Sequence, residues 1–301
     1  MLGSVFALSS AFFWALAVIL FKKSGDNFSP LSLNIYKSVV ALVLITLTML
    51  VLGIPFFPDV EPSAWVLLAL SGFLGITLAD ILFFTALNHL GAGLVAIVEC
   101  IYLPSVLFFS FFLLGEQLGP TGILGSLLVL SAIFVGSITK KELKQKTKIT
   151  RRTRYNRDTM VGVISGLLSV VLMALGIVMI KGVLEHTNVF WATLVRVIAG
   201  CITLFAIVIF HPGRKKYIEE LKFSRAWLTA LPASVSGNFI ALLFWVAGMK
   251  YTTASQAAIL NQMSTIFIFI LAAVWLKETI TVQKAIAICL AFTGACLTIF
   301  T

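Results

Sequence analysis

Residues 32–52 read SLNIYKSVVALVLITLTMLVL, an apolar run interrupted by one charge, Lys37. A transmembrane helix needs about 20 predominantly apolar residues to cross a hydrocarbon layer roughly 30 Å thick. This stretch therefore predicts a membrane-spanning helix. Its lysine is an intramembrane cation, which needs either a partner or contact with water.

The rest of the chain has the same character. Of the 301 residues, 60% are apolar or aromatic and only 11% are charged, and the mean hydropathy is +1.07. These values exceed those of soluble domains and predict an all-α integral membrane protein with little room for a soluble domain. A span-length window predicts ten transmembrane helices, at residues 4–21, 32–52, 64–87, 91–114, 120–138, 160–180, 188–210, 226–249, 253–276 and 281–300.

An internal repeat organises these helices into two sets of five. At an offset of 159, Gly3, Ala15, Lys22 and Lys37 match Gly162, Ala174, Lys181 and Arg196. At an offset of 162, Ala92, Ala96, Ile97, Glu99 and Glu116 match Ala254, Ala258, Ile259, Asn261 and Glu278. Because five is odd, the two sets enter the membrane from opposite sides. The sequence thus predicts two inverted five-helix repeats, at 1–139 and 159–301, joined by a basic linker loop at 140–158.

The net charge of +10 is concentrated in loops. Nine of the 22 Lys and Arg residues lie between Lys140 and Arg157, and five lie between Arg214 and Arg225. Odd-numbered loops hold 17 of the 22 and even-numbered loops hold two. The positive-inside rule then predicts cytoplasmic odd loops and external termini, and we expect no nucleic-acid partner.

Three ionisable residues of the first half are expected to lie at a similar depth. Lys37, Asp80 and Glu99 fall roughly 8–12 Å from the predicted cytoplasmic face at 1.5 Å per residue. We expect a cluster in which the cation offsets one carboxylate and leaves the other free to take up a proton. The alternatives are a Lys37 ammonium that reaches interfacial water, or a purely structural ion pair.

The second half keeps the cation and loses the acids. Arg196 matches Lys37, whereas Asn261 replaces Glu99 and Leu242 stands opposite Asp80. The expected polar neighbours of Arg196 are the amides Asn238, Asn261 and Gln262. Because these do not neutralise the arginine, a carboxylate or phosphate of a ligand is the predicted partner.

Other side chains are candidates for supporting roles. Trp14, Tyr102 and Trp245 could line a cavity or simply pack between helices. Glu116 and Glu278 each precede the next predicted helix, where a carboxylate can cap exposed amide groups. The three histidines are dispersed, and neither a phosphate-binding glycine loop nor a nucleophile motif is found, so we expect no metal, no cofactor and no enzyme.

Several short motifs give the chain a resemblance to a known family. They are Phe13-Trp14-Ala15 with Lys22, the stretch from Ala92 through Glu99 and Pro104 to Glu116, and Tyr251–Ser255 and Leu276–Glu278 in the second half. In order and duplication they resemble the EamA-type ten-helix members of the drug/metabolite transporter superfamily. The resemblance implies export or exchange of amino acids, other metabolites or drugs by alternating access to a central cavity. The chain departs from the family pattern at Met173 and Ile266, which replace a Trp and a Pro in the second copy.

Taken together, these features predict a secondary active transporter in the cell membrane, in contact with the lipid bilayer. Its expected partners are a small organic solute and protons as the coupling ion. A membrane-embedded lipid-modifying enzyme and a channel are the alternatives. The oligomeric state is left open between a monomer and a homodimer. Many members of the resembled family are drawn with cytoplasmic termini, in conflict with the charge distribution.

Overall fold

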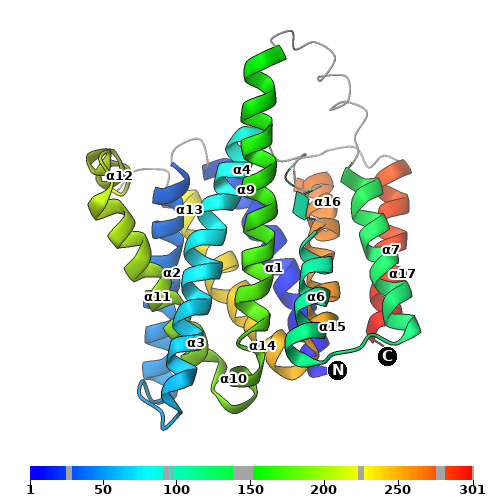
Figure 1. The fold of residues 1–301 in the computed structure, drawn as a ribbon, viewed down its shortest axis with the longest axis horizontal. Coiled ribbons are helices and arrows are strands. Elements are labelled where there is room, and N and C mark those ends of the chain that lie inside the picture. The colour runs from blue at the N-terminus through cyan, green and yellow to red at the C-terminus, as the bar shows by residue number, and fades with distance from the viewer. Residues whose placement is uncertain are drawn as a thin grey trace.

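A computed structural model gives the fold of residues 1–24, 29–90, 95, 98–99, 101–137, 152–222, 227–275 and 282–299. In these ranges every regular element is a helix (Figure 1). The elements are α1 (Leu2–Ser24), α2 (Pro30–Leu52), α3 (Pro62–Gly72), η1 (Phe73–Ala79), α4 (Asp80–Leu90), α6 (Tyr102–Leu114), α7 (Pro120–Ser137), α9 (Arg152–Val178), α10 (Lys181–His186), α11 (Val189–Phe210), α12 (Arg214–Glu220), α13 (Trp227–Ser234), η2 (Val235–Ala241), α14 (Leu242–Tyr251), α15 (Ala254–Asn261), α16 (Met263–Trp275) and α17 (Val282–Ile299).

The described residues include six helices that are long and apolar enough to cross a membrane. They are Leu2–Phe21, Leu31–Leu52, Pro62–Ala86, Thr159–His186, Val189–Phe210 and Ala230–Tyr251. Shorter apolar helices are Tyr102–Leu114, Pro120–Ile133 and Ala285–Leu297. The predicted all-helical architecture is confirmed within these limits, while the total of ten spans stays a prediction.

The first helix of each part of the chain packs against the other part. Helix α1 contacts η2 and α14, and α9 contacts η1 and α4. Helix α11 packs against both α2 and α3, while α7 and α17 form a pair at one side of the bundle (Figure 1). The interior is therefore built from helices that are far apart in sequence.

Two hydrogen bonds repeat along these contacts. Ser10 Oγ donates to the carbonyl of Ala241 over 2.9 Å, and Ser169 Oγ donates to that of Ala79 over 2.7 Å. Ser169 follows Ser10 by 159 residues, and Ala241 follows Ala79 by 162. These are the two offsets that the sequence repeat predicts.

Two glycines permit close helix approach at equivalent places. A Cβ atom on Gly3 would lie 2.5 Å from the carbonyl carbon of Tyr251, and one on Gly162 would lie 2.9 Å from the Cβ of His89. Both distances are too short for carbon atoms, so a larger residue would force the helices apart. The pairs Gly3/Gly162 and His89/Tyr251 again differ by 159 and 162 residues.

The predicted helices at 64–87 and 226–249 are not regular α-helices throughout. Each contains a π-helical segment, η1 or η2, and the two segments lie 162 residues apart. In η1, Asn34 Nδ2 donates to the carbonyl of Ile76 over 3.1 Å, and Ser169 occupies that of Ala79. Because side chains from other helices satisfy these carbonyls, the regular i→i+4 ladder is not required there.

The prediction of unbroken helices at 91–114 and 253–276 is also wrong. Gln262 lies in a turn between α15 and α16, and Ile101 lies in a turn before α6. These residues follow Asn261 and Glu99 closely, so both interruptions occur at the polar positions. Pro104 lies in the first turn of α6. Amide groups in the first turn of a helix have no intrahelical acceptor, so the missing N–H of Pro104 removes no hydrogen bond from the helix.

Glu116 caps a different helix from the one predicted. Its Oε1 accepts from the amide of Ala254 over 2.7 Å, and its Oε2 accepts from the amide and the hydroxyl of Ser255 over 2.9 and 2.7 Å. The carboxylate therefore caps the N-terminus of α15 and not that of α7. Its predicted counterpart Glu278 lies outside the described residues.

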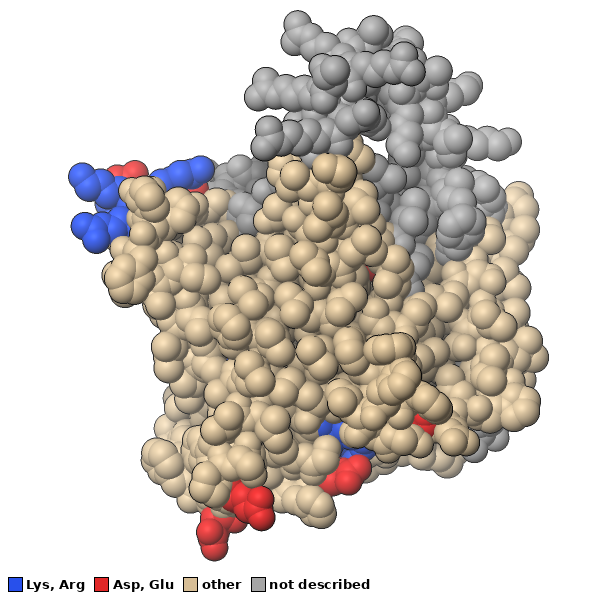
Figure 2. Space-filling view, in the orientation of Figure 1, with Lys and Arg blue, Asp and Glu red and all other residues tan. Residues whose placement is uncertain are grey.

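Charged residues gather at the two ends of the bundle. Figure 2 shows Lys and Arg over α12 at one end, with acidic side chains beside them, and at the opposite end acidic side chains with some Lys or Arg among them. The exposed residues there include Lys215 and Lys216 on α12, and Asp59 and Glu61 between α2 and α3. Residues 140–151 of the predicted linker lie outside the described residues, whereas 152–158 already belong to α9.

Candidate functional site

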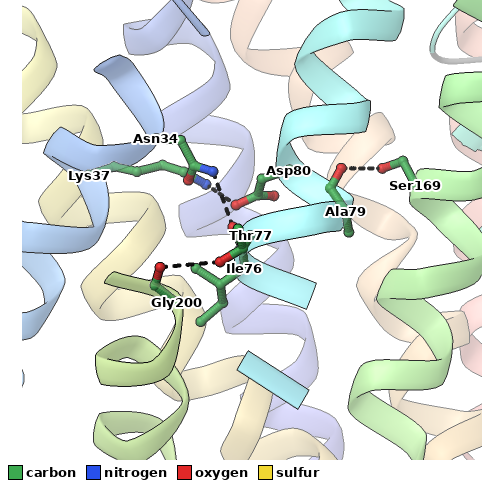
Figure 3. Close-up of polar contacts among 8 residues, drawn as sticks. All are labelled: Asn34, Lys37, Ile76, Thr77, Ala79, Asp80, Ser169 and Gly200. Carbon is green, nitrogen blue, oxygen red and sulfur yellow. Dashed lines mark hydrogen bonds and ion pairs between the residues drawn. The ribbon is translucent and has the colours of Figure 1, made fainter. Parts of the chain in front are cut away.

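Lys37 and Asp80 form a buried ion pair. The distance from Lys37 Nζ to Asp80 Oδ2 is 2.7 Å, and the side chains are 5% and 13% exposed (Figure 3). Asp80 is the first residue of α4, directly after η1, and its carboxylate reaches Lys37 on α2. The ammonium also lies 5.6 Å from the centre of the Phe84 ring, a favourable cation–π distance.

Glu99 lies apart from this pair. No partner for its carboxylate is found among the described residues, and its side chain is exposed. Val95 and Leu103, four positions before and after it, are buried at 2% and 0% exposure. Glu99 therefore lies between two buried positions, just before the turn at Ile101. The predicted three-residue cluster thus forms only in part.

Arg196 is the buried cation of α11. Its side chain is 4% exposed, and Nε and Nη1 have no hydrogen-bond partner among the described residues. A Cβ on Gly72 would overlap the Arg196 backbone, which brings α3 and α11 into direct contact. A Cβ on Gly75 would lie 3.6 Å from Nη2, and the Tyr102 phenol lies within electrostatic range of the guanidinium.

The sequence did not reveal two of these neighbours. Gly75 and Tyr102 come from the first half of the chain, whereas only second-half amides were predicted around Arg196. The helix rotation that brings them together leaves no simple pattern in the sequence. A glycine does recur at the same place in the two π-helical segments, Gly75 in η1 and Gly237 in η2.

The predicted amides lie on two elements. Asn238 is buried within η2, while Asn261 is the last residue of α15 and Gln262 is the turn residue between α15 and α16. Asn261 Oδ1 and Gln262 Nε2 are buried and have no partner within the described ranges. Buried amides without partners are costly and are typical of binding sites or of helices that rearrange.

The three aromatic residues predicted as cavity candidates, Tyr102, Trp245 and Trp14, pack between helices. The rings of Tyr102 and Trp245 have centroids 6.4 Å apart, which is within the range of aromatic pairing. Trp14 packs against η2, because its Cε3 atom lies 3.6 Å from the Cβ position of Gly237. Whether they line a cavity stays a prediction.

Asn34 is a site residue that sequence reasoning missed. It lies three residues before Lys37, on the same face of α2, and is fully buried. Its Nδ2 binds η1, as shown in Figure 3, while its Oδ1 has no partner among the described residues. The signal was its spacing from Lys37, since residues three apart are neighbours on a helix.

The described residues contain no group of three or more His, Cys, Asp or Glu side chains that could hold a metal ion. Among the residues that the structure describes, the site instead holds the Lys37–Asp80 pair, the Glu99 carboxylate without a partner and the Arg196 guanidinium without an acidic partner. These lie beside π-helical segments and helix interruptions.

A family comparison now identifies the chain. The model of the EamA-like transporter family matches residues 1–138 and again residues 160–300. The chain belongs to the EamA-like transporter family. This EamA-like protein is thus a multi-pass membrane protein of a transporter family, as the motifs predicted.

A solved crystal structure described only as that of a protein has the same fold. Its TM-score against this EamA-like chain is 0.78, with 17% identity over 98% of this chain and 95% of the other. A search of curated proteins finds no match.

Proposed function

We propose that this EamA-like protein is a secondary active transporter that exchanges a small organic solute for protons across the cell membrane. The proposal includes ten transmembrane helices in two inverted halves, 1–139 and 159–301. The recurrence of the Ser10 and Ser169 hydrogen bonds and of η1 and η2 at the predicted offsets supports that organisation.

Helix interruptions near the polar residues support alternating access. In transporters built from inverted repeats, binding sites lie near the membrane midplane, where helices are interrupted and backbone groups become available. Here the turns at Ile101 and Gln262 adjoin Glu99 and Asn261. A continuous pore needs no such paired interruptions, and a lipid-modifying enzyme would need a nucleophile or a metal site at an interface.

The observation that supports proton coupling is that the Glu99 carboxylate has no partner among the described residues. A carboxylate within a membrane helix is expensive unless it is paired or reached by water. Glu99 is exposed and has no partner among the described residues, although Val95 and Leu103, four positions before and after it, are buried. A carboxylate in that position can gain and lose a proton as the protein alternates. Asp80 is less suited to this role because it already has Lys37 as its partner.

The test is transport in proteoliposomes with a panel of radiolabelled amino acids and other small metabolites, with and without a pH gradient. We expect wild-type protein to concentrate at least one solute when a gradient is imposed. Glu99→Gln keeps the shape of the side chain but cannot ionise, so it should abolish gradient-driven accumulation. Counterflow without a gradient should persist.

Glu185→Gln is the matched control, because Glu185 is an exposed carboxylate at the end of α10. That variant should transport like the wild type. Unchanged gradient-driven transport by Glu99→Gln would rule out this coupling role. A steady single-channel conductance would instead favour a channel.

We further propose that the end carrying α12 faces the cytoplasm. The basic residues of α12 and the acidic residues between α2 and α3 lie at opposite ends of the bundle, which supports this orientation (Figure 2). In a variant without its native cysteines, Lys215→Cys should be protected from an impermeant thiol reagent in intact cells, and Asp59→Cys should be labelled. The reverse pattern would invert the topology.

A further inference from the structure

In the part of the chain that the structure describes, the guanidinium of Arg196 has no acidic partner. Arg196 is seven residues into α11, which places it roughly 10 Å from the start of the helix. Its side chain is 4% exposed, and no acidic side chain among the described residues pairs with it. An isolated ion at this depth is strongly unfavourable, so an anion that binds there would relieve a large penalty.

The first half of the chain shows what the second half lacks. Lys37, which matches Arg196 at the offset of 159, has Asp80 as its partner over 2.7 Å. At the place that matches Asp80, the second half has Leu242. Leu242 begins α14 directly after η2, as Asp80 begins α4 directly after η1. The second half thus has a helix position equivalent to that of Asp80, but this position holds the apolar Leu242 and not a carboxylate.

The surroundings of Arg196 suit the anionic group of a partly aromatic or apolar solute. Gly75 has no side chain, and the Cβ position that a larger residue would fill lies 3.6 Å from Arg196 Nη2. Tyr102 on α6 is buried and lies close enough to interact electrostatically with the guanidinium. The adjoining Trp245 ring adds an apolar surface. Arginine presents several N–H donors in a plane, which matches the oxygens of a carboxylate or phosphate.

We propose that Arg196 binds the carboxylate or phosphate of a small organic anion, which occupies the place that Asp80 holds in the first half. This inference rests on the proposed transport function and names its substrate class. The ligand is a soluble anion and not a lipid headgroup, because Arg196 lies well inside the helix while headgroups lie at its ends.

The test measures binding, without any gradient. Purified protein in phosphatidylcholine nanodiscs is titrated with benzoate, phenyl phosphate and inorganic phosphate, and with benzamide as the uncharged isostere of benzoate. Binding is read from the melting temperature and from equilibrium binding of radiolabelled anions. We expect at least one anion to bind and to raise the melting temperature, and we expect benzamide to do neither.

Two variants should remove that binding in different ways. Arg196→Gln should weaken it at least tenfold. Without ligand it should melt at or above the wild-type temperature, because an unpartnered charge is removed. Leu242→Asp should also weaken binding at least tenfold, because it supplies the internal carboxylate. Leu242→Asn is its uncharged control and should bind within about twofold of wild type, as should Lys181→Gln, which changes a buried cation paired with Glu185.

Several results would overturn the inference. They are equal binding of benzamide, anion binding that is unchanged in Arg196→Gln, and no Arg196-dependent binding of any of these anions. Stabilisation only by phosphatidylglycerol in the nanodiscs would assign the site to lipid and also overturn it. The coupling role of Glu99 is tested separately by gradient-driven transport, so either idea can fail while the other stands.

Discussion

Lys37 on α2 and Asp80 on α4 hold each other in the interior, with Nζ and Oδ2 2.7 Å apart. Because both charges are desolvated, the pair contributes less net stability than its Coulomb energy suggests. Loss of one partner is a different matter, since the other charge then stays buried and uncompensated.

Asp80→Asn should therefore destabilise the protein by about 3–5 kcal/mol. The measurement is the free energy of unfolding in detergent, from reversible denaturation or from the shift in melting temperature. The double variant Lys37→Met/Asp80→Asn should recover most of the loss, because no unpaired charge remains. A double variant as unstable as Asp80→Asn alone would show that packing, and not charge, sets the cost.

Glu116→Ala should loosen the start of α15. The change removes three hydrogen bonds to a carboxylate, from the Ala254 amide and from the Ser255 amide and hydroxyl. A cost of about 2–3 kcal/mol is expected, since the amides are left without acceptors. Hydrogen exchange at the first turn of α15 is the direct measurement, and exchange there as slow as in wild type would contradict the capping role.

Ser10→Ala and Ser169→Ala should have similar effects. Each removes one buried hydrogen bond to a carbonyl at the end of a π-helical segment, Ala241 or Ala79. We expect about 0.5–1.5 kcal/mol for each variant and near additivity for the double variant. Unfolding free energies that differ several-fold between the two serines would argue against equivalent roles.

Glu220 should make the α12 end of the protein sensitive to acid. Partial burial raises the pKa of Glu220, but hydrogen bonds from Ser29 and Ser32 and the charge of Lys216 outweigh it and lower the pKa below its usual value of 4.5. The Ser29 amide donates to Oε2 over 2.9 Å. A carboxylate with a lowered pKa in the folded state contributes stability above its unfolded pKa, and that stability is lost as pH falls through the folded value.

The measurement is the melting temperature between neutral pH and about pH 3. Glu220→Gln should melt below wild type at neutral pH, and the difference should vanish in acid. Glu219→Gln, a change at the exposed neighbouring carboxylate, should track wild type throughout. A constant gap between Glu220→Gln and wild type would assign the effect to shape and not to charge.

The helices were predictable because the length of each apolar run can be read directly from the sequence. Residues 32–52, predicted as one span, lie within α2 at Pro30–Leu52. The pairing of Lys37 with Asp80 followed from their equal depth. Helix rotation was not predictable, because the lipid side and the protein side of these helices are both apolar. For this reason Glu99 was expected beside Lys37, and Tyr102 was not expected beside Arg196.

The π-helical segments and interruptions were missed for another reason. Their carbonyls are satisfied by side chains from distant helices, as at Ile76 and Ala79, so the departure from regular geometry is a tertiary effect. Similarly, Glu116 was expected to cap the helix nearest in sequence, whereas the fold presents it to α15. Local reasoning identified the capping residue but not its partner.

The first helix of each part of the chain packs against the other part, and this has a consequence for biogenesis. Helix α1 contacts η2 and α14, and α9 contacts η1 and α4. During synthesis, α1 and α4 therefore emerge long before the helices that complete their surroundings. The amino-terminal half is therefore inserted into the bilayer before the helices that pack against it have been synthesised. During that interval, its buried Lys37–Asp80 pair can hold α2 and α4 together. A ribosome stalled before residue 152 should expose this half to membrane chaperones and proteases. Synthesis of α9 should cover α4 and η1, and α1 should stay exposed until η2 and α14 have been made.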